Sequence, residues 1–359
     1  MRRVLLALCG LLLASSLVSS TCAQELRFPF PYDNSVPNPL KQKIGNQMFH
    51  DSRLSINRTT SCIDCHQPAK GFCDNKQVSE GILTRINGQD VRAQGTRNAP
   101  SLLNVAFFQR QFWDGVSPSG LTDQMWRPLQ NGVEHGQQTP VQLENRIRQI
   151  PGYVAEFRQA YGRDPDLASI AASMEQFEMQ IVATDTHWNR AEHGETWCMD
   201  AKEKLGYAIF KGKGMCVQCH NGPALTNNQL YDIGTEYFSR RGNLNGQDQG
   251  AILARGIPNQ DGNPAYNRAF KTPGLVAVGI TQPYMHNGSF RTLRDCVLYF
   301  NAGGYFRNGD GRYVRDPNIH PLIRPLGLTA EECDALEYFL AVSTYPADYP
   351  NITLEPLPR

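Results

Sequence analysis

The sequence predicts a mostly α-helical protein with two similar domains and long irregular loops. The pattern C-x-x-C-H occurs twice, in TSCIDCH and again in GMCVQCH, and each copy follows a helical stretch that contains G-x-x-x-F. Helical patterns also fill the region between the copies, whereas strand-like alternation is scarce. Loops rich in Gly, Asn and Pro at 221–270 and 301–325 are typical of chain that wraps a ligand. We therefore expect domains near residues 24–195 and 196–359.

The first residues have the organisation of an export signal. A basic pair precedes the apolar run VLLALCGLLLA, which is too short to span a bilayer, and small and polar residues follow it. We expect residues 1–23 to be a signal peptide that is cleaved near Ala23. Cys22 could indicate a lipoprotein, but Thr21 before it makes a poor lipobox, which favours simple cleavage.

The predicted helical framework rests on the repeat and on the stretches between its two copies. Gly45 and Phe49 of LKQKIGNQMFH match Gly206 and Phe210 of AKEKLGYAIFK. Between the motifs, TPVQLENRIRQIPGYVAEFRQAYG and DLASIAASMEQFEMQIVA combine helical periodicity with good helix formers, and a turn at Pro165 separates them.

Each C-x-x-C-H is the attachment signature of a c-type haem, in which two thiols add to the haem vinyl groups and the histidine binds iron. A single C-x-x-C could be a disulfide, a redox dithiol or half a zinc site, but a terminal His in both copies and no second C-x-x-C near either argue against zinc. The sequence therefore predicts two cytochrome c-like domains in the bacterial periplasm. Their two covalent haems would be held by Cys62, Cys65 and His66 and by Cys216, Cys219 and His220.

Composition excludes few partners but gives no reason to expect nucleic acid. The leader removes two of 35 basic residues and none of 34 acidic ones, so the mature chain is close to neutral and has no basic block. No later segment is apolar enough to span a membrane, so we expect a soluble mature protein. An oxidising compartment permits disulfides among the four remaining cysteines, whose pairing the sequence does not assign: Cys73, Cys198, Cys296 and Cys333.

Several collinear stretches give the chain a resemblance to a known family. RNAPSLLNVAFFQRQFWDGVSPSGLTDQMWRPLQNGVEHG follows the first motif, MFHDSRLS precedes it, and PYMHNGSFRTL follows the second. In this order they resemble the bacterial dihaem cytochrome c peroxidase and MauG family over nearly the whole mature chain. The resemblance implies a peroxidatic haem in the first domain and an electron-transfer haem in the second.

The resemblance also implies a distal catalytic set. Gln124, Pro128 and Glu134 match the family pattern Q-x3-P-x5-E around the first haem. Glu134 would be the acid–base residue and Gln124 a hydrogen-bonding partner of bound peroxide. Without the resemblance, a single Glu on a loop is more typical of a solvated surface charge. His135 departs from the usual Met at its position and could alter the proton supply.

Two further features are implied between the domains. Trp113, in FWDG, matches a tryptophan that relays electrons between the haems, although one extra residue in GVSPSGLTDQ shifts it relative to Gln124. By residue type alone it would be a core or interface aromatic. Asn98, Thr281 and Pro283 match a calcium site, and oxygen ligands suit that ion, although Asn and Pro are also common in turns.

The axial positions differ from those of the ordinary peroxidases. Those enzymes cap the first haem with a His shortly before N-A-P, and GILTRINGQDVRAQGTRNAP contains no His, so the resemblance implies an open first haem. The family's sixth ligand of the second haem, Met or the Tyr of MauG, lies fourteen residues beyond His286, where this chain has Phe300. Tyr299 is the leading substitute, but a helix turns about 100° per residue, so Tyr299 would need a register shift or a bulge. An open or water-bound second haem is the alternative.

Three functions compete at this point. The first is a periplasmic peroxidase that reduces hydrogen peroxide with electrons from a small cytochrome c or cupredoxin. The second is a MauG-like enzyme that oxidises Trp or Tyr side chains of a partner protein, and the third is a non-enzymatic electron carrier. Gln124 and Glu134 disfavour the carrier, the missing His and Met favour the second function, and Phe300 counts against it. We expect peroxidase chemistry, with the final electron donor and a homodimer both left open.

Overall fold

The computed structural model describes residues 37–116, 121–235, 268–307 and 312–359. The predicted leader and much of the loop expected at 221–270 lie outside these residues. The α-helices are α1 (Pro39–His50), α2 (Cys62–Cys65), α3 (Leu121–Gln130), α4 (Pro140–Arg148), α5 (Pro151–Tyr161), α6 (Leu167–Glu178), α7 (His187–Glu192), α8 (Ala201–Lys211), α10 (Leu293–Asn301) and α11 (Ala330–Val342). The strands are β1 (Glu80–Ile86), β2 (Gln89–Gln94), β3 (Leu230–Tyr231), β4 (Phe270–Lys271), β5 (Phe306–Arg307) and β6 (Tyr313–Val314). The expected mostly α class with irregular loops is confirmed.

Local signals set the helix boundaries. α5 ends where Gly162 adopts a left-handed conformation, and Asp166 caps α6 by accepting a hydrogen bond from the Ser169 backbone. The turn at Pro165 thus separates these helices as predicted. Thr329 and Glu332 form a capping box at the start of α11, which satisfies backbone donors at that end.

The G-x-x-x-F repeat is a packing repeat. In α1, Gly45 lies against α6 so closely that a Cβ atom would collide with the Ser173 carbonyl oxygen. One turn later, the ring centroids of Phe49 and Phe177 are 4.9 Å apart. Because glycine has no side chain, the two helix backbones approach closely and each Phe then fills the space beside the crossing.

The same arrangement recurs at α8 and α11. A Cβ atom on Gly206 would collide with the Ala335 carbonyl oxygen, and the ring centroids of Phe210 and Phe339 are 5.3 Å apart. Both helix pairs therefore use a glycine and a phenylalanine four residues apart, beside their own C-x-x-C-H motif.

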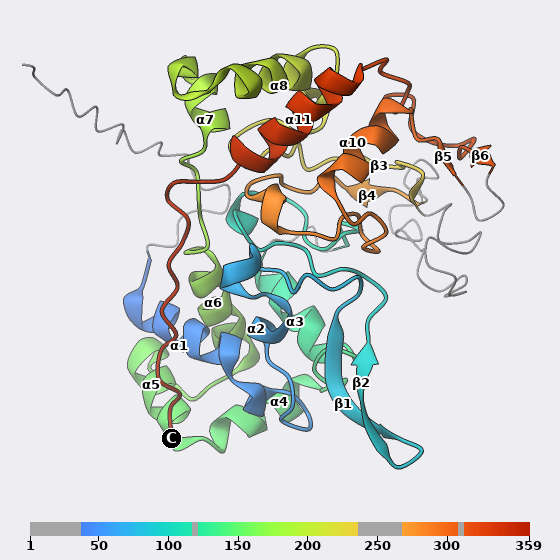
Figure 1. Cartoon of the computed structure of the whole chain (residues 1–359). Coiled ribbons are helices and arrows are strands. Elements are labelled where there is room, and N and C mark those ends of the chain that lie inside the picture. Colours follow the sequence, from blue (N-terminus) through green and yellow to red (C-terminus); the bar gives the residue numbers. More distant parts are fainter. Residues whose placement is uncertain (1–36, 117–120, 236–267, 308–311) are drawn as a thin grey trace, which may run out of the picture.

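The helices and strands form two lobes, and the boundary between the lobes differs from the predicted domain boundary. In Figure 1, α1–α6 and the β1–β2 hairpin form the lower lobe, and α7, α8, α10, α11 and β3–β6 form the upper one. Trp188 of α7 is fully buried and packs in the upper lobe against the rings of Tyr207, Phe210 and Phe339. The chain therefore enters the upper lobe before α7. The predicted first domain, residues 24–195, included this helix, so the predicted boundary lies too late in the sequence.

The C-terminal tail returns to the lower lobe, as the red trace in Figure 1 shows. The Gly152 backbone donates to the Arg359 carbonyl at 2.7 Å, and the Asn46 amide donates to the Thr353 carbonyl at 2.9 Å. Two lobes are thus present in space, but a single cut of the chain does not separate them.

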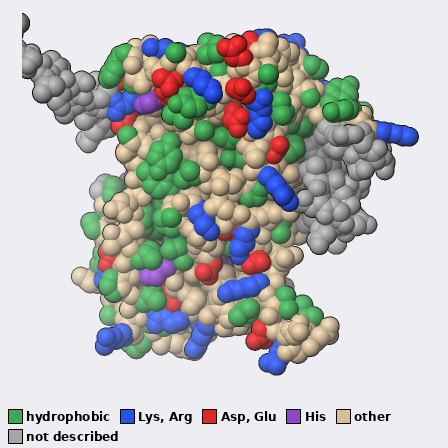
Figure 2. Space-filling view, in the orientation of Figure 1, with side chains coloured by type: hydrophobic (Ala, Val, Ile, Leu, Met, Phe, Trp, Pro, Cys, Tyr) green, Lys and Arg blue, Asp and Glu red, His purple; other side chains and the backbone are tan. Residues whose placement is uncertain are grey.

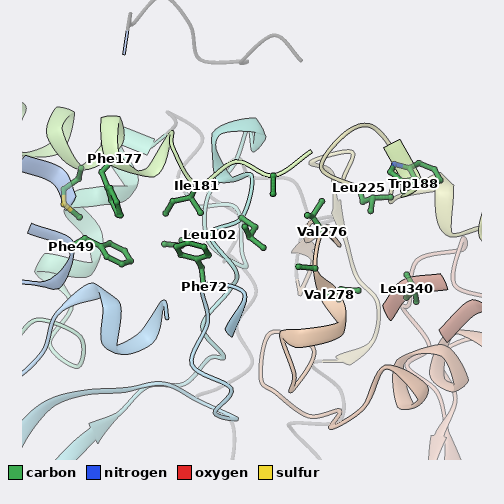
Figure 3. Close-up of a cluster of buried hydrophobic side chains, with 14 of the residues drawn as sticks. Phe49, Phe72, Leu102, Phe177, Ile181, Trp188, Leu225, Val276, Val278 and Leu340 are labelled. Carbon is green, nitrogen blue, oxygen red and sulfur yellow. The ribbon is translucent and has the colours of Figure 1, made fainter. Parts of the chain in front are cut away.

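The main core is continuous through both lobes. Phe49, Phe72, Leu102, Phe177 and Ile181 belong to it in the lower lobe, and Trp188, Leu225, Val276, Val278 and Leu340 in the upper one (Figure 3). Burial of this apolar surface is the main favourable contribution to holding the lobes together.

A β-hairpin before the N-A-P motif was not expected. β1 and β2 pair antiparallel with Ile86 opposite Gln89, and Asn87 and Gly88, both with positive φ, form the two-residue turn. An Asn-Gly pair is the residue choice that this turn type favours. The other strands have two residues each.

The face of the molecule seen in Figure 2 carries no dominant charge. Figure 2 shows Lys and Arg side chains intermingled with Asp and Glu over the visible face. No helix among the described residues is both long and apolar enough to cross a bilayer.

Candidate cofactor and active site

One cavity connects the two C-x-x-C-H motifs. Its volume is about 850 Å³, at the upper end of the range of roughly 300–1,000 Å³ for small-molecule sites. The first motif is the single turn α2 with His66 as its C-cap, and the second begins in a 3₁₀ turn, Cys216–Gln218. All six residues predicted to hold haem line this cavity: Cys62, Cys65, His66, Cys216, Cys219 and His220.

Both motif histidines are prepared to act as neutral ligands. His66 Nδ1 lies 2.9 Å from the Phe72 carbonyl oxygen, and His220 Nδ1 lies 3.0 Å from that of Leu225. Donation from Nδ1 leaves the lone pair on Nε2, the atom available to a metal. Burial lowers the pKa of both imidazoles, that of His220 to about 4, so both are neutral at physiological pH.

The four thiols of the two C-x-x-C-H motifs are also in a state that suits covalent attachment of haem. None is in a disulfide, and burial raises the pKa of each, so they are protonated thiols at neutral pH. Free thiols paired with a neutral His on one cavity wall fit c-type attachment. Within the described residues, no disulfide joins any two of the other four cysteines: Cys73, Cys198, Cys296 and Cys333.

The predicted distal residues meet on the wall of the cavity near the first motif. Gln124 on α3 and Glu134 on the following loop both line it, together with Pro128. Burial raises the pKa of the Glu134 carboxyl to about 7, in the range where a group can both accept and return a proton. The Gln124 Oε1 atom is buried and has no hydrogen-bond partner among the described residues, so a ligand donor could satisfy it.

Asn131 is a site residue that sequence reasoning missed. Its Nδ2 donates to Glu134 Oε1 at 2.9 Å, and its Oδ1 accepts from the Val133 backbone at 2.8 Å. Asn131 therefore fixes the carboxyl relative to its loop. Its place in QNGVE, three residues before Glu134, was the available signal, but Asn-Gly indicates a turn first.

Trp113 lies where the lobes meet and lines the same cavity. Its Nε1 donates to the Asn98 carbonyl at 2.8 Å, and its own carbonyl accepts from the Lys271 backbone at 2.7 Å. Trp113 is thus attached to both lobes, to the lower one through its indole and to the upper one through its backbone carbonyl.

This geometry can be compared with known proteins. Residues 39–196 match the family model for di-haem cytochrome c peroxidase. Cytochrome-c peroxidase IdrP1 of Denitromonas iodatirespirans is 31% identical over 335 residues, which cover 87% of this chain and 83% of that protein. The chain belongs to the dihaem cytochrome c peroxidase and MauG family.

Other relatives extend over most of the chain. Methylamine utilization protein MauG of Methylorubrum extorquens is 29% identical, covering 92% of this chain and 84% of MauG. A crystal structure of a MauG-like protein associated with microbial copper homeostasis has a TM-score of 0.72 and 23% identity, covering 90% of this chain and 97% of that one. The structural likeness shows a shared fold.

The loop that carries the capping His in ordinary family peroxidases is the β1–β2 hairpin here. Its residues 80–94 include no His. His135, which replaces the family's Met, is instead buried on the cavity wall, with Nδ1 3.3 Å from the Pro128 carbonyl oxygen. Burial lowers its pKa to about 4, so it is neutral and does not supply a charge to the site.

The structure does not support Tyr299 as an iron ligand. Its hydroxyl donates to the Ile233 carbonyl, and its side chain does not line the cavity. The residues of α10 that line the cavity are Leu293, Cys296, Val297 and Phe300. The rotation of about 100° per residue explains this result, because no bulge shifts α10.

The three residues of the predicted calcium site line the same cavity. Asn98, Thr281 and Pro283 all line the cavity at the lobe boundary, although they are far apart in sequence. The Asn98 side chain donates to the Lys76 carbonyl through Nδ2, which leaves its oxygen as the group for a cation. Neutral oxygen donors suit calcium. No cluster of three acidic, His or Cys side chains adds to this set within the described ranges.

Proposed function

We propose that this chain is an exported, periplasmic dihaem c-type enzyme that reduces hydrogen peroxide at its first haem. The observation that carries the proposal is Glu134, a carboxyl whose pKa burial raises to about 7, in the same cavity as His66. Family membership supports peroxidase chemistry in general. The proposed electron donor is a small periplasmic cytochrome c or cupredoxin.

The residues that would hold the cofactors are the two motif sets. Cys62 and Cys65 would form thioether bonds to one haem and His66 would bind its iron through Nε2, with the second motif acting likewise. When bound, the haems supply the peroxide-binding iron and the electrons for reduction. Asn98, Thr281 and Pro283 would hold calcium where the lobes meet.

The protein's own contribution is proton movement. Hydrogen peroxide must lose a proton from one oxygen and gain one on the other before water can leave. Glu134 would accept the first proton on its carboxylate and return it to the departing oxygen. Asn131 holds the carboxylate through Oε1, and the unpartnered oxygen of Gln124 would accept a hydrogen bond from peroxide.

A MauG-like function is the second candidate, and the β1–β2 hairpin favours it. Without a His there, the first site needs no reductive opening, and Trp113 offers a route from one site to the other. The oxidising equivalents of peroxide would then pass to a Trp or Tyr of a partner protein. A pure electron carrier has no use for the Glu134 and Gln124 pair, which argues against that function.

One experiment separates these functions. The resting oxidised holoprotein is characterised by EPR and optical spectroscopy and then titrated with peroxide, with and without reduced cytochrome c. The proposed peroxidase oxidises cytochrome catalytically and in proportion to peroxide. A MauG-like enzyme reacts with peroxide but turns over slowly with cytochrome, and a protein that is inert in both titrations would refute both functions.

A further inference from the structure

Lys271 on β4 is a buried cation on the wall of the cavity. Its side chain belongs to a residue that is 6% exposed, and its ammonium lies 4.1 Å from the centroid of the Phe108 ring. The nearest polar partner is the Thr272 carbonyl oxygen at 3.4 Å, which is a weak hydrogen bond. Burial lowers the pKa of this amine to about 7.

The buried ammonium of Lys271 needs an anionic partner if it is to stay charged. Burying an ammonium without a partner costs several kcal/mol or forces it to lose its proton. Other partly buried cations here have carboxylates: Arg97 pairs with Asp114 at 2.6 Å, and Arg268 pairs with Asp232 at 2.7 Å. Within the described ranges, no carboxylate pairs with Lys271.

The backbone fixes Lys271 close to the second motif. β4 pairs with β3, which places Lys271 opposite Leu230, and the Lys271 backbone donates to the Trp113 carbonyl. The Thr272 carbonyl that the Lys271 ammonium contacts also accepts a hydrogen bond from the Thr226 hydroxyl at 2.7 Å. The carbonyl of the residue preceding Thr226, Leu225, accepts from His220 Nδ1 at 3.0 Å. The cation therefore belongs to the second site and not to the peroxide-binding side.

We propose that Lys271 binds a propionate carboxylate of the haem held by Cys216, Cys219 and His220, and thereby raises the reduction potential of that haem. This inference rests on the proposed function, since it requires the second haem. A haem carries two propionates, and an ammonium in a cavity of low dielectric constant is a strong partner for one of them. The cation stabilises the reduced haem because reduction adds negative charge next to it.

The test compares purified holoproteins that carry Lys271→Met, Lys271→Arg or Lys213→Met. Lys213 is a matched control because it lies close to the second motif in sequence but is exposed and pairs with Glu332 at the surface. Intact mass first counts the haems in each protein. Potentiometric titration then gives the potential of each haem, and resonance Raman spectra report the propionate modes.

We expect Lys271→Met to lower the potential of the second haem and to shift its propionate modes, with the first haem unchanged. Lys271→Arg should restore both readouts, and Lys213→Met should leave them at their wild-type values because solvent screens that charge. Loss of the second haem from Lys271→Met but not from Lys271→Arg would also support the proposal.

The proposal would be overturned if Lys271→Met keeps both haems and the reduction potential of its second haem is unchanged. Loss of the second haem from both Lys271→Met and Lys271→Arg would also overturn it, because the positive charge would then not be the cause. A wild-type mass without two haems would instead refute the proposed function. The two failures are therefore distinguishable.

Discussion

Replacing Glu134 by Gln removes the proton acceptor at the first site while keeping the size of the side chain. Gln can still accept the hydrogen bond from Asn131, so the loop should keep its position. A positioned acid–base group typically contributes about 10²–10⁴-fold to a rate. We therefore expect the bimolecular reaction with peroxide to slow by that factor, which corresponds to about 2.7–5.5 kcal/mol of transition-state stabilisation.

The pH dependence of the wild-type reaction with peroxide gives a second, independent test of the role of Glu134. Because burial raises the pKa of Glu134 to about 7, the carboxyl is protonated below that pH and cannot accept a proton from peroxide. Lowering the pH from 7 to 6 reduces the ionised fraction from roughly a half to roughly a tenth, so the wild-type rate should fall roughly fivefold. Glu134→Gln should lack this dependence.

The assay is stopped-flow mixing of oxidised holoprotein with excess peroxide at several pH values. Glu192→Gln is the matched control, because it makes the same chemical change at a surface residue that pairs with Lys211. If Glu134→Gln reacts at the wild-type rate and with the wild-type pH profile, Glu134 is not the acid–base residue and the assignment of this loop is incorrect.

Three further predictions concern single side chains. Gln124→Ala removes a neutral hydrogen bond worth about 0.5–1.5 kcal/mol, so stopped-flow measurement should show a loss of only about 2–12-fold, and a loss as large as that of Glu134→Gln would contradict this role. Tyr299→Phe should leave both haem spectra unchanged and lower the thermal midpoint slightly, because it removes the bond to the Ile233 carbonyl; a spin-state change would restore Tyr299 as a ligand. Gly45→Ala should destabilise the α1–α6 crossing by about 1–3 kcal/mol in thermal melts, whereas Gly132→Ala, which has room for a methyl group, should not; equal melting of the two would contradict the packing argument.

The sequence predicted those features that depend on short-range patterns. The match of Gly45 with Gly206 predicted a repeated helix before each motif, and the structure shows that both glycines lie at helix crossings, where a missing side chain is a local steric requirement. The spacing of C-x-x-C-H likewise predicted haem attachment, which fits the cavity that both motifs line, and Glu134 and Gln124 were found through the family pattern.

Other features depend on tertiary contacts or on weaker signals. Nothing local indicates that α7 packs in the upper lobe or that the tail returns to Asn46. The β1–β2 hairpin has a signal in Asn87 and Gly88, but a single Asn-Gly pair indicates a turn without showing that the flanking residues pair as strands. Lys271 could not be recognised either, because lysine is usually exposed and only the fold shows its burial.

The mass of the intact mature protein tests the central claim most directly, because every proposed role depends on two covalently bound haems. The account predicts a polypeptide without residues 1–23 plus two haem masses, neither of which is removed by acid acetone. A single added haem, or haem that acid acetone extracts, would contradict it.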